Sequence, residues 1–167
     1  MIEIKPLTEN ELSARVELLN NPEISKFLNT HEIFNIEKTI NWFKEIKKDK
    51  SRFDCVFYVN TQIIGMGGLV KINYINKNAE LYMYLNPVFQ GMGFGFKSAK
   101  KLCEYGFNKF NLEKIYLFTF NENYRANRLY EKLGFKLEGI LRQHTIKDGV
   151  LKDRNVYGLL KSEFAKQ

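Results

Sequence analysis

The chain has 167 residues, 44% of them hydrophobic and 27% charged, which is typical of a globular domain and excludes a disordered chain. Its net charge of +7 permits acidic partners, but the lysines are scattered, and the run 44–50 mixes acids with bases like a solvated helix face. The two cysteines form no zinc or disulfide pattern, no metal site is predicted, and no apolar run approaches the ~18 residues of a membrane helix.

The first half of the sequence predicts a short strand, three helices and then three strands. Thr8 and Glu11 have the spacing of a capping box at the start of the first helix. Pro22 suits the first turn of the second helix, and Asn35 suits the N-cap of the third. The expected elements are a strand at 2–7, helices after Thr8, within 20–28 and after Asn35, and strands at 54–59, 62–70 and 79–85.

The second half predicts two more helices and three more strands. The pair Asp148-Gly149 is typical of a tight hairpin turn, and Gly134 is suited to end the preceding helix. The expected elements are a helix from about Gly95 to Phe110, a strand at 114–120, a helix at 122–133, and strands at 140–147 and 150–160. The first of these helices is expected to bury Phe96, Ala99, Cys103, Phe107 and Phe110. Together the elements predict one mixed α/β domain over 1–167, built on one sheet.

The glycine-rich stretch GMGFGFKS, residues 91–98, partly matches two nucleotide-related motifs. A Walker A loop requires glycine where Phe96 stands, and the aromatic RNA-binding motif requires a strand where the following periodicity is helical. A strand, a glycine loop and a helix in that order instead favour an anion held by amides at the helix N-terminus. Gly91, Gly93 and Gly95 would let the backbone approach a pyrophosphate closely.

A second motif follows about thirty residues later, in NENYRANRLYEKLGF. On a helix, Asn123, Asn127 and Tyr130 share one face because they are spaced i, i+4, i+7. With Q-G-M-G-F-G before it, this pattern resembles the GCN5-related N-acetyltransferase (GNAT) superfamily over roughly residues 60–165. The resemblance is closest to the branch with ribosomal-protein, spermidine and nucleotide-linked amino-sugar acetyltransferases.

The resemblance implies a GNAT fold, with a mostly antiparallel central sheet flanked by helices, and acetyl-CoA as the acyl donor. It implies that Tyr130 protonates the departing thiolate, a role open to a phenol because a pKa of ~10 leaves it protonated at neutral pH, as a thiol with a pKa of ~8.5 also mostly is. The implied contacts to the pyrophosphate are Gln90, Gly91, Met92, Gly93, Phe94, Gly95 and Phe96; those to the pantetheine arm are Leu85, Asn86 and Val88; and those from the second helix are Asn123 and Asn127.

The reaction also needs a group that takes a proton from the acceptor amine. Strand alternation places Glu80 on the same face as Tyr82 and Tyr84, which are candidate substrate contacts. Glu80 is the best candidate base, while a cross-strand ion pair with a lysine remains an equal alternative. By family analogy, His31 is a candidate contact in the acceptor pocket, and His144 is expected to be a surface residue.

We therefore expect a cytoplasmic acetyl-CoA-dependent N-acetyltransferase that acts by direct transfer to a primary amine. The acceptor could be an amino sugar, a polyamine or a protein N-terminus. A polyamine is disfavoured because the segment 27–35 has Glu32 as its one acidic residue, whereas a nucleotide-linked amino sugar would suit the basic balance of the chain. The alternatives are a non-catalytic acyl-CoA-binding domain and a nucleic-acid-binding module, the second disfavoured because no clustered basic stripe is present. Family members often form dimers, so a homodimer is an expectation; a membrane partner is not.

Overall fold

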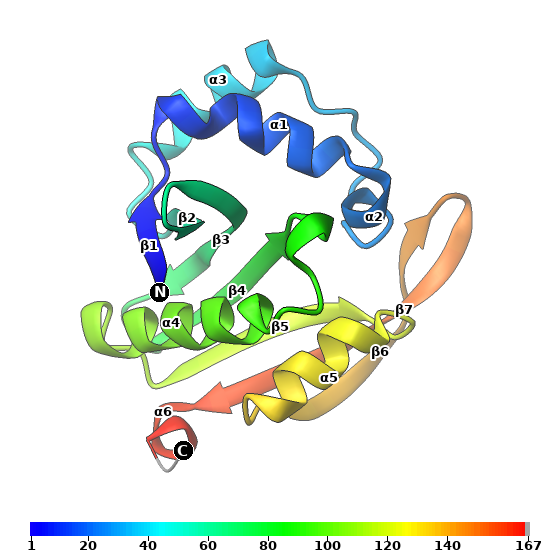
Figure 1. Ribbon diagram of the computed structural model, residues 1–167. Coiled ribbons are helices and arrows are strands. Elements are labelled where there is room, and N and C mark those ends of the chain that lie inside the picture. The colour runs from blue at the N-terminus through cyan, green and yellow to red at the C-terminus, as the bar shows by residue number, and fades with distance from the viewer. Residues whose placement is uncertain (166–167) are drawn as a thin grey trace.

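The computed structural model describes residues 1–165, which form a seven-stranded sheet with helices on both faces (Figure 1). The strand order is β1-β2-β3-β4-β5-β7-β6, with β4 and β5 parallel and the other neighbouring strands antiparallel. The strands are β1 (Ile2–Pro6), β2 (Phe53–Val59), β3 (Gln62–Asn73), β4 (Asn78–Leu85), β5 (Lys114–Phe120), β6 (Lys136–Lys147) and β7 (Val150–Leu160). The α-helices are α1 (Leu12–Asn20), α2 (Pro22–Ser25), α3 (Ile36–Ile46), α4 (Phe94–Lys109), α5 (Tyr124–Lys132) and α6 (Lys161–Phe164).

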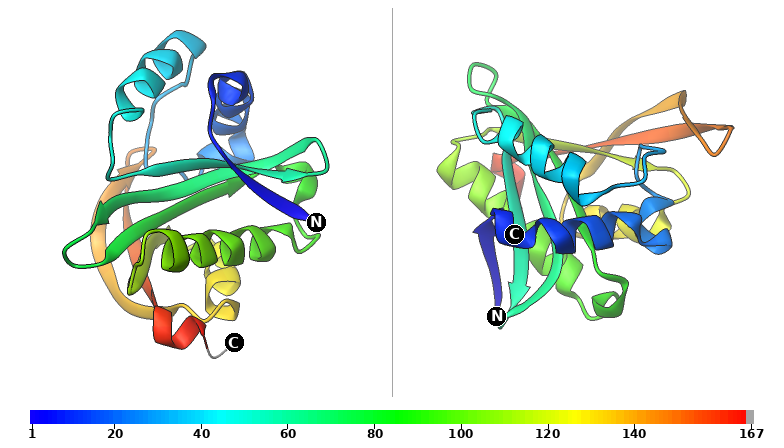
Figure 2. Two further views of the ribbon diagram at one scale, coloured as in Figure 1. Left: turned by 90° about the vertical axis from the view of Figure 1, so that its left-hand side faces the viewer. Right: turned by 90° about the horizontal axis from the view of Figure 1, so that it is seen from above.

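The helices separate into two layers, one on each face of the sheet (Figure 2). Helices α4 and α5 cover one face through a large apolar cluster that includes Leu102, Cys103 and Leu133. Helices α1 and α2 cover the other face through a smaller cluster around Leu19 and Tyr84. This is the mixed, mostly antiparallel sheet that the sequence predicts. Among the described residues, no helix combines the length and apolar character needed to cross a membrane.

The feature that positions the site is the divergence of β4 from β5. The two strands pair over Asn78–Glu80 and Lys114–Tyr116. Beyond Glu80, β4 continues beside β3 and β5 continues beside β7, so the two strands no longer share hydrogen bonds. Because neighbouring strands normally satisfy each other's backbone groups, this divergence leaves one edge of β4 open in the middle of the sheet.

Local sequence signals account for the caps and turns. The Thr8 hydroxyl accepts a hydrogen bond from the Asn10 N–H, and Glu11 accepts one from the Thr8 N–H at 2.9 Å. The capping box therefore forms, although it starts a short 3₁₀ turn (Glu9–Glu11) directly before α1. Asp148 and Gly149 both have positive φ, 51° and 75°, as a tight hairpin turn requires.

Two predicted elements differ from the structure. The second helix is only Pro22–Ser25, capped by Asn21, which accepts a hydrogen bond from the Glu23 N–H at 2.9 Å, and the chain continues to α3 as turns and irregular structure. On α4, Phe96 and Phe110 are partly exposed, while Leu102 and Gly106 complete the inward face. Cys103 is fully buried, as predicted.

Candidate active site

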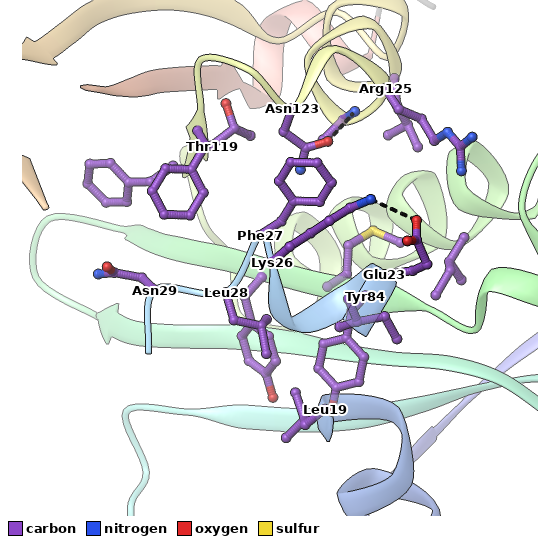
Figure 3. A pocket seen from close by; sticks show the side chains of 18 of the residues that line it. Leu19, Glu23, Lys26, Phe27, Leu28, Asn29, Tyr84, Thr119, Asn123 and Arg125 are labelled. Carbon is purple, nitrogen blue, oxygen red and sulfur yellow. Dashed lines mark hydrogen bonds and ion pairs between the residues drawn. The ribbon is translucent and has the colours of Figure 1, made fainter. Parts of the chain in front are cut away.

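A cleft of about 630 Å³ opens where β4 and β5 diverge. One wall is formed by β4 residues from Glu80 to Leu85, and another by Phe118–Phe120 of β5. Residues of α2 and the segment after it cover the cleft from one side, and the start of α5 lies opposite, as Figure 3 shows for Phe27 and Asn123. Seven of the predicted site residues line this cleft, namely Glu80, Tyr82, Tyr84, Leu85, Gln90, Asn123 and Tyr130.

The glycine loop between β4 and α4 has the geometry of an anion site. Gly91 and Gly93 have φ of 79° and 77°, and a side chain added at either would meet no atom within 4 Å. The N–H groups of Gly91, Met92 and Gly93 make no hydrogen bond within residues 1–165, and those of the first α4 turn have no intrahelical partner. Open space above unbonded amides at a helix N-terminus fits a pyrophosphate.

Gly95 has a different role from the one predicted. It is buried on the inward side of α4, where a Cβ would lie 2.8 Å from Leu129 and 3.0 Å from Leu85. The absence of a side chain therefore lets α4 pack closely against α5 and the end of β4 and does not serve the approach of a ligand. The Gly95 amide remains part of the first turn of the helix.

The loop is fixed by neighbouring side chains. Asn86 accepts a hydrogen bond from the Val88 N–H at 3.1 Å, and Gln90 donates one to the Leu85 carbonyl at 3.4 Å. Arg125, at the start of α5, donates a hydrogen bond to the Gln90 side chain and so ties the two motifs together. Val88 and Met92 are exposed, so these two positions offer mainly backbone groups to a cofactor.

The two asparagines of the second motif behave differently. Asn123 lines the cleft and caps α5 by accepting a hydrogen bond from the Ala126 N–H at 3.3 Å. Asn127 is buried, accepts from the Thr119 hydroxyl at 2.5 Å, and donates to the Asn121 carbonyl at 3.0 Å. It lines a smaller cavity behind α5 and not the cleft. Asn127 therefore joins α5 to β5, and a direct cofactor contact from its side chain loses support.

Tyr130 lines the cleft from α5 and is 7% exposed. Its ring packs edge-on against Phe135, with 5.5 Å between the centroids, and its hydroxyl makes no hydrogen bond within residues 1–165. Burial, with a smaller contribution from Cys103, raises the pKa of Tyr130 well above the usual value for tyrosine. The phenol therefore keeps its proton throughout the pH range in which enzymes work, as a general acid must before it acts.

Glu80 is the last β4 residue that pairs with β5 and lies at the base of the cleft. Its carboxylate, 17% exposed, forms an ion pair of 2.7 Å with Lys71, whose side chain is 70% exposed. The hydrogen bond to Glu80 is the main reason that the pKa of Lys71 is raised. The ion pair with a lysine that the sequence suggested for Glu80 therefore exists. So exposed a pair contributes only ~0–1 kcal/mol to stability, and the role of Glu80 as a base stays a prediction.

The other predicted substrate contacts are partly committed elsewhere. The Tyr82 hydroxyl donates to Asp54, and the Tyr84 hydroxyl accepts from Arg15 at 2.6 Å, so mainly their rings are left to line the cleft. Burial raises the pKa of Tyr84 to about 12. His31 is exposed and its Nε2 lies 2.8 Å from the Ile146 carbonyl oxygen; the histidine does not line the cleft, although the segment before it does. His144 is exposed, as predicted.

A family model for an acetyltransferase (GNAT) domain matches residues 2–136. This chain belongs to the GNAT acetyltransferase family. The spermidine N(1)-acetyltransferase of Escherichia coli K12 is 33% identical over 142 residues, which cover 84% of this chain and 75% of that protein. A solved structure of the Vibrio cholerae spermidine N-acetyltransferase with CoA and spermine has a TM-score of 0.94 at 27% identity over 98% of both chains. A dodecameric structure of that enzyme has a TM-score of 0.86 at 27% identity, covering 98% and 95% of the chains.

These matches confirm the resemblance, the fold and the reaction class that the two motifs predict. The protein is an N-acetyltransferase that uses acetyl-CoA. The geometry of this GNAT chain also fits acetyl-CoA. The unbonded amides at the α4 N-terminus suit a pyrophosphate, and the open β4 edge suits the pantetheine amides.

Several cleft residues of this GNAT enzyme were not singled out from the sequence, among them Glu23, Glu122 and Arg154. Arg154 on β7 lines the cleft, and its guanidinium lies 4.8 Å from the Phe118 ring centroid and 5.9 Å from that of Phe120. Its Nε is buried without a hydrogen-bond partner, and it forms no ion pair with the described residues. Burial lowers its pKa, and the Glu80 carboxylate partly opposes that shift. No motif contains Arg154, because only the sheet brings β7 to the cleft.

Proposed function

We propose that this enzyme transfers an acetyl group directly from acetyl-CoA to a primary amine, with Glu80 as proton acceptor and Tyr130 as proton donor. The donor supplies a thioester carbonyl at the cleft. Glu80, directly or through water, removes the proton of the amine as the new C–N bond forms. Tyr130 gives its proton to sulfur as the C–S bond breaks. No nucleophilic side chain of the enzyme is acylated on this route.

The observation that carries the proposal is the shared cleft of these two groups. Glu80 lies on β4 at the point of divergence and Tyr130 on α5, yet both line the same cavity. The tyrosine hydroxyl is unbonded within the described chain and protonated, and the glutamate is paired with one exposed lysine that a substrate ammonium can displace. An acid and a base that line one cleft are what aminolysis of a thioester requires.

We propose an aliphatic polyamine as the acceptor. Three carboxylates line the cleft, and each is paired with a lysine side chain: Glu23 with Lys26 at 2.7 Å, Glu80 with Lys71 at 2.7 Å, and Glu122 with Lys152 at 2.6 Å. Each lysine marks a place where an alkylammonium group can bind. The spermidine acetyltransferases among the relatives support the same class of acceptor.

A second class of acceptor is favoured by Arg154. An unpaired guanidinium in the cleft would repel the inner ammonium groups of a polyamine and bind an anionic group. A nucleotide-linked amino sugar carries such a group next to its primary amine. The two classes make opposite predictions for one panel of acceptors.

Spermidine is expected to give a kcat/KM roughly tenfold higher than a simple alkyl monoamine or a UDP-linked amino sugar, because each further ammonium–carboxylate contact adds ~0.2–1 kcal/mol. Thiol release from acetyl-CoA measures the rates. Glu122→Gln should raise the KM for spermidine and leave the monoamine unchanged, since the monoamine does not reach that carboxylate. A preference for the amino sugar that Arg154→Gln abolishes would reject the polyamine and establish the second class.

We also propose that copies of the chain associate through β6, one of the two edge strands of the sheet. Leu137 and Ile140 on this strand are 51% and 50% exposed, and the hairpin tip adds Ile146, Val150 and Leu151. Exposed apolar side chains on an edge strand are typical of an interface, and a relative is dodecameric.

Static light scattering should give a particle mass that is a multiple of 19.7 kDa, and the Ile140→Lys substitution should lower that mass. A 19.7 kDa particle at micromolar concentration would refute self-association.

A further inference from the structure

The tip of the β6–β7 hairpin lies against the segment between α2 and α3, over a hundred residues earlier in the chain (Figure 1). Two side chains, those of Thr145 and His31, make contacts at the edge of this junction. The Thr145 hydroxyl donates to Asn29, and the Nε2 of His31 lies 2.8 Å from the Ile146 carbonyl oxygen. Both involve exposed groups, so they are individually weak.

The central contact is made by Lys147, the last residue of β6. This residue is 9% exposed, and its ammonium group donates hydrogen bonds to the Ser25 carbonyl at 2.9 Å and the Thr30 carbonyl at 2.8 Å. No carboxylate of residues 1–165 pairs with it. A buried cation without hydrogen bonds is strongly unfavourable, so the two carbonyl groups and the ammonium hold one another in place.

The two carbonyl groups mark the ends of one wall of the cleft. All residues between Ser25 and Thr30 line the cleft, and Figure 3 shows Lys26, Phe27, Leu28 and Asn29 projecting around it. This wall is irregular, with turn hydrogen bonds such as Phe27 N–H to Ile24 carbonyl at 3.0 Å as its internal support. Its shape therefore depends on an anchor from outside, and Lys147 clamps both ends at once.

We infer that Lys147 is a positioning residue for the acceptor amine: by clamping Ser25 and Thr30 it sets the shape of the 26–29 wall. It does not line the cleft and touches no reacting group. Its bonds are made to the α2 side and not to the 85–96 segment that would hold the donor. The inference rests on the proposed function in one respect, namely that the acceptor lies against the 26–29 wall.

Lys147→Met removes the ammonium and keeps most of the aliphatic volume. We expect the KM for the best acceptor of the panel to rise about tenfold, the size expected when hydrogen bonds to a charged group are lost. The KM for acetyl-CoA and kcat at saturating acceptor should stay within about twofold. Lys147→Arg, which can still donate to both carbonyl groups, should restore most of the acceptor affinity.

Lys136→Met is the matched control. Lys136 lies at the other end of β6 and pairs with Glu163 at 2.5 Å, where its side chain is 72% exposed. This variant should leave both KM values unchanged. Equal effects of the two substitutions, or a Lys147→Met protein that loses thermal stability without a selective rise in acceptor KM, would mean that the lysine only stabilises the hairpin.

Amide hydrogen exchange gives a readout that does not depend on the acceptor or on turnover. In Lys147→Met, exchange over 25–30 should accelerate at least several-fold while exchange over 91–98 stays the same. If exchange over 25–30 is unchanged, the inference about Lys147 is wrong even if the acceptor is a polyamine. If exchange is faster but no polyamine is acetylated, the proposed acceptor is wrong and the inference about Lys147 still holds. Should Lys147→Met not fold, Lys147→Gln, which removes the ammonium but keeps a polar group, tests the same clamp, and unchanged acceptor KM and unchanged exchange over 25–30 would contradict it.

Discussion

Replacing Tyr130 with phenylalanine is expected to lower kcat by about a hundredfold while the affinity for acetyl-CoA stays within about twofold. A positioned general acid typically contributes a factor of ~10²–10⁴, and the substitution removes the proton that the departing thiolate needs. The ring and its packing against Phe135 remain. Because the hydroxyl makes no hydrogen bond within the described chain, we expect thermal stability to be unchanged. Steady-state rates, together with direct titration of acetyl-CoA, measure the two effects.

Tyr157→Phe is the matched control for this experiment. Tyr157 is also buried, but its hydroxyl donates to Glu131 at 2.9 Å in the smaller cavity behind α5. Its loss should cost about 1 kcal/mol of stability without lowering kcat. If the two variants lose equal activity, or if Tyr130→Phe retains full turnover, Tyr130 is not the acid.

The raised pKa of Tyr130 also predicts the alkaline side of the pH profile. Burial disfavours the charged phenolate, so the proton is lost at a higher pH than in a free tyrosine, whose pKa is near ~10. Turnover at saturating substrates should therefore not fall through deprotonation of this group below about pH 10. A decline at lower pH that disappears in Tyr130→Phe would contradict this assignment.

Short-range signals in the sequence were sufficient for most of the fold. The capping box at Thr8, the turn at Asp148-Gly149 and the periodicity of α5 each depend on residues within one or two turns of chain. Their physical cause is local, so they can be recognised without tertiary structure. The two motifs likewise sufficed to name the family, because each combines a loop or helix with a fixed order along the chain.

Contacts between distant elements could not be predicted in this way. The position of Gly95 against Leu129 depends on how closely α4 approaches α5. The arrival of Arg154 in the cleft depends on strand order, which places β7 next to β5. The Lys147 clamp joins residues more than a hundred positions apart. Periodicity and spacing contain no information on any of these, since each follows from packing of the whole sheet.

At Glu80 the residues alone favour a base and an ion pair equally, and the family resemblance favours the base; the structure identifies Lys71 as the partner whose replacement separates the two roles. If Glu80 takes the proton of the amine, Glu80→Gln should lower kcat/KM by about a hundredfold. The deficit should shrink as the pH rises towards ~10, where a growing fraction of a primary amine is already neutral in solution. Profiles of kcat/KM from pH 7 to 10 for both proteins measure this convergence.

Lys71→Met distinguishes a base from an ion pair. It removes the same 2.7 Å interaction but leaves the carboxylate in the cleft, and the lysine is too exposed for the loss to disturb the fold. We expect kcat/KM to stay within about threefold of the original enzyme. If both variants lose activity equally, and the loss follows their thermal stability, Glu80 acts only through the ion pair, and the proton must leave the amine by another route.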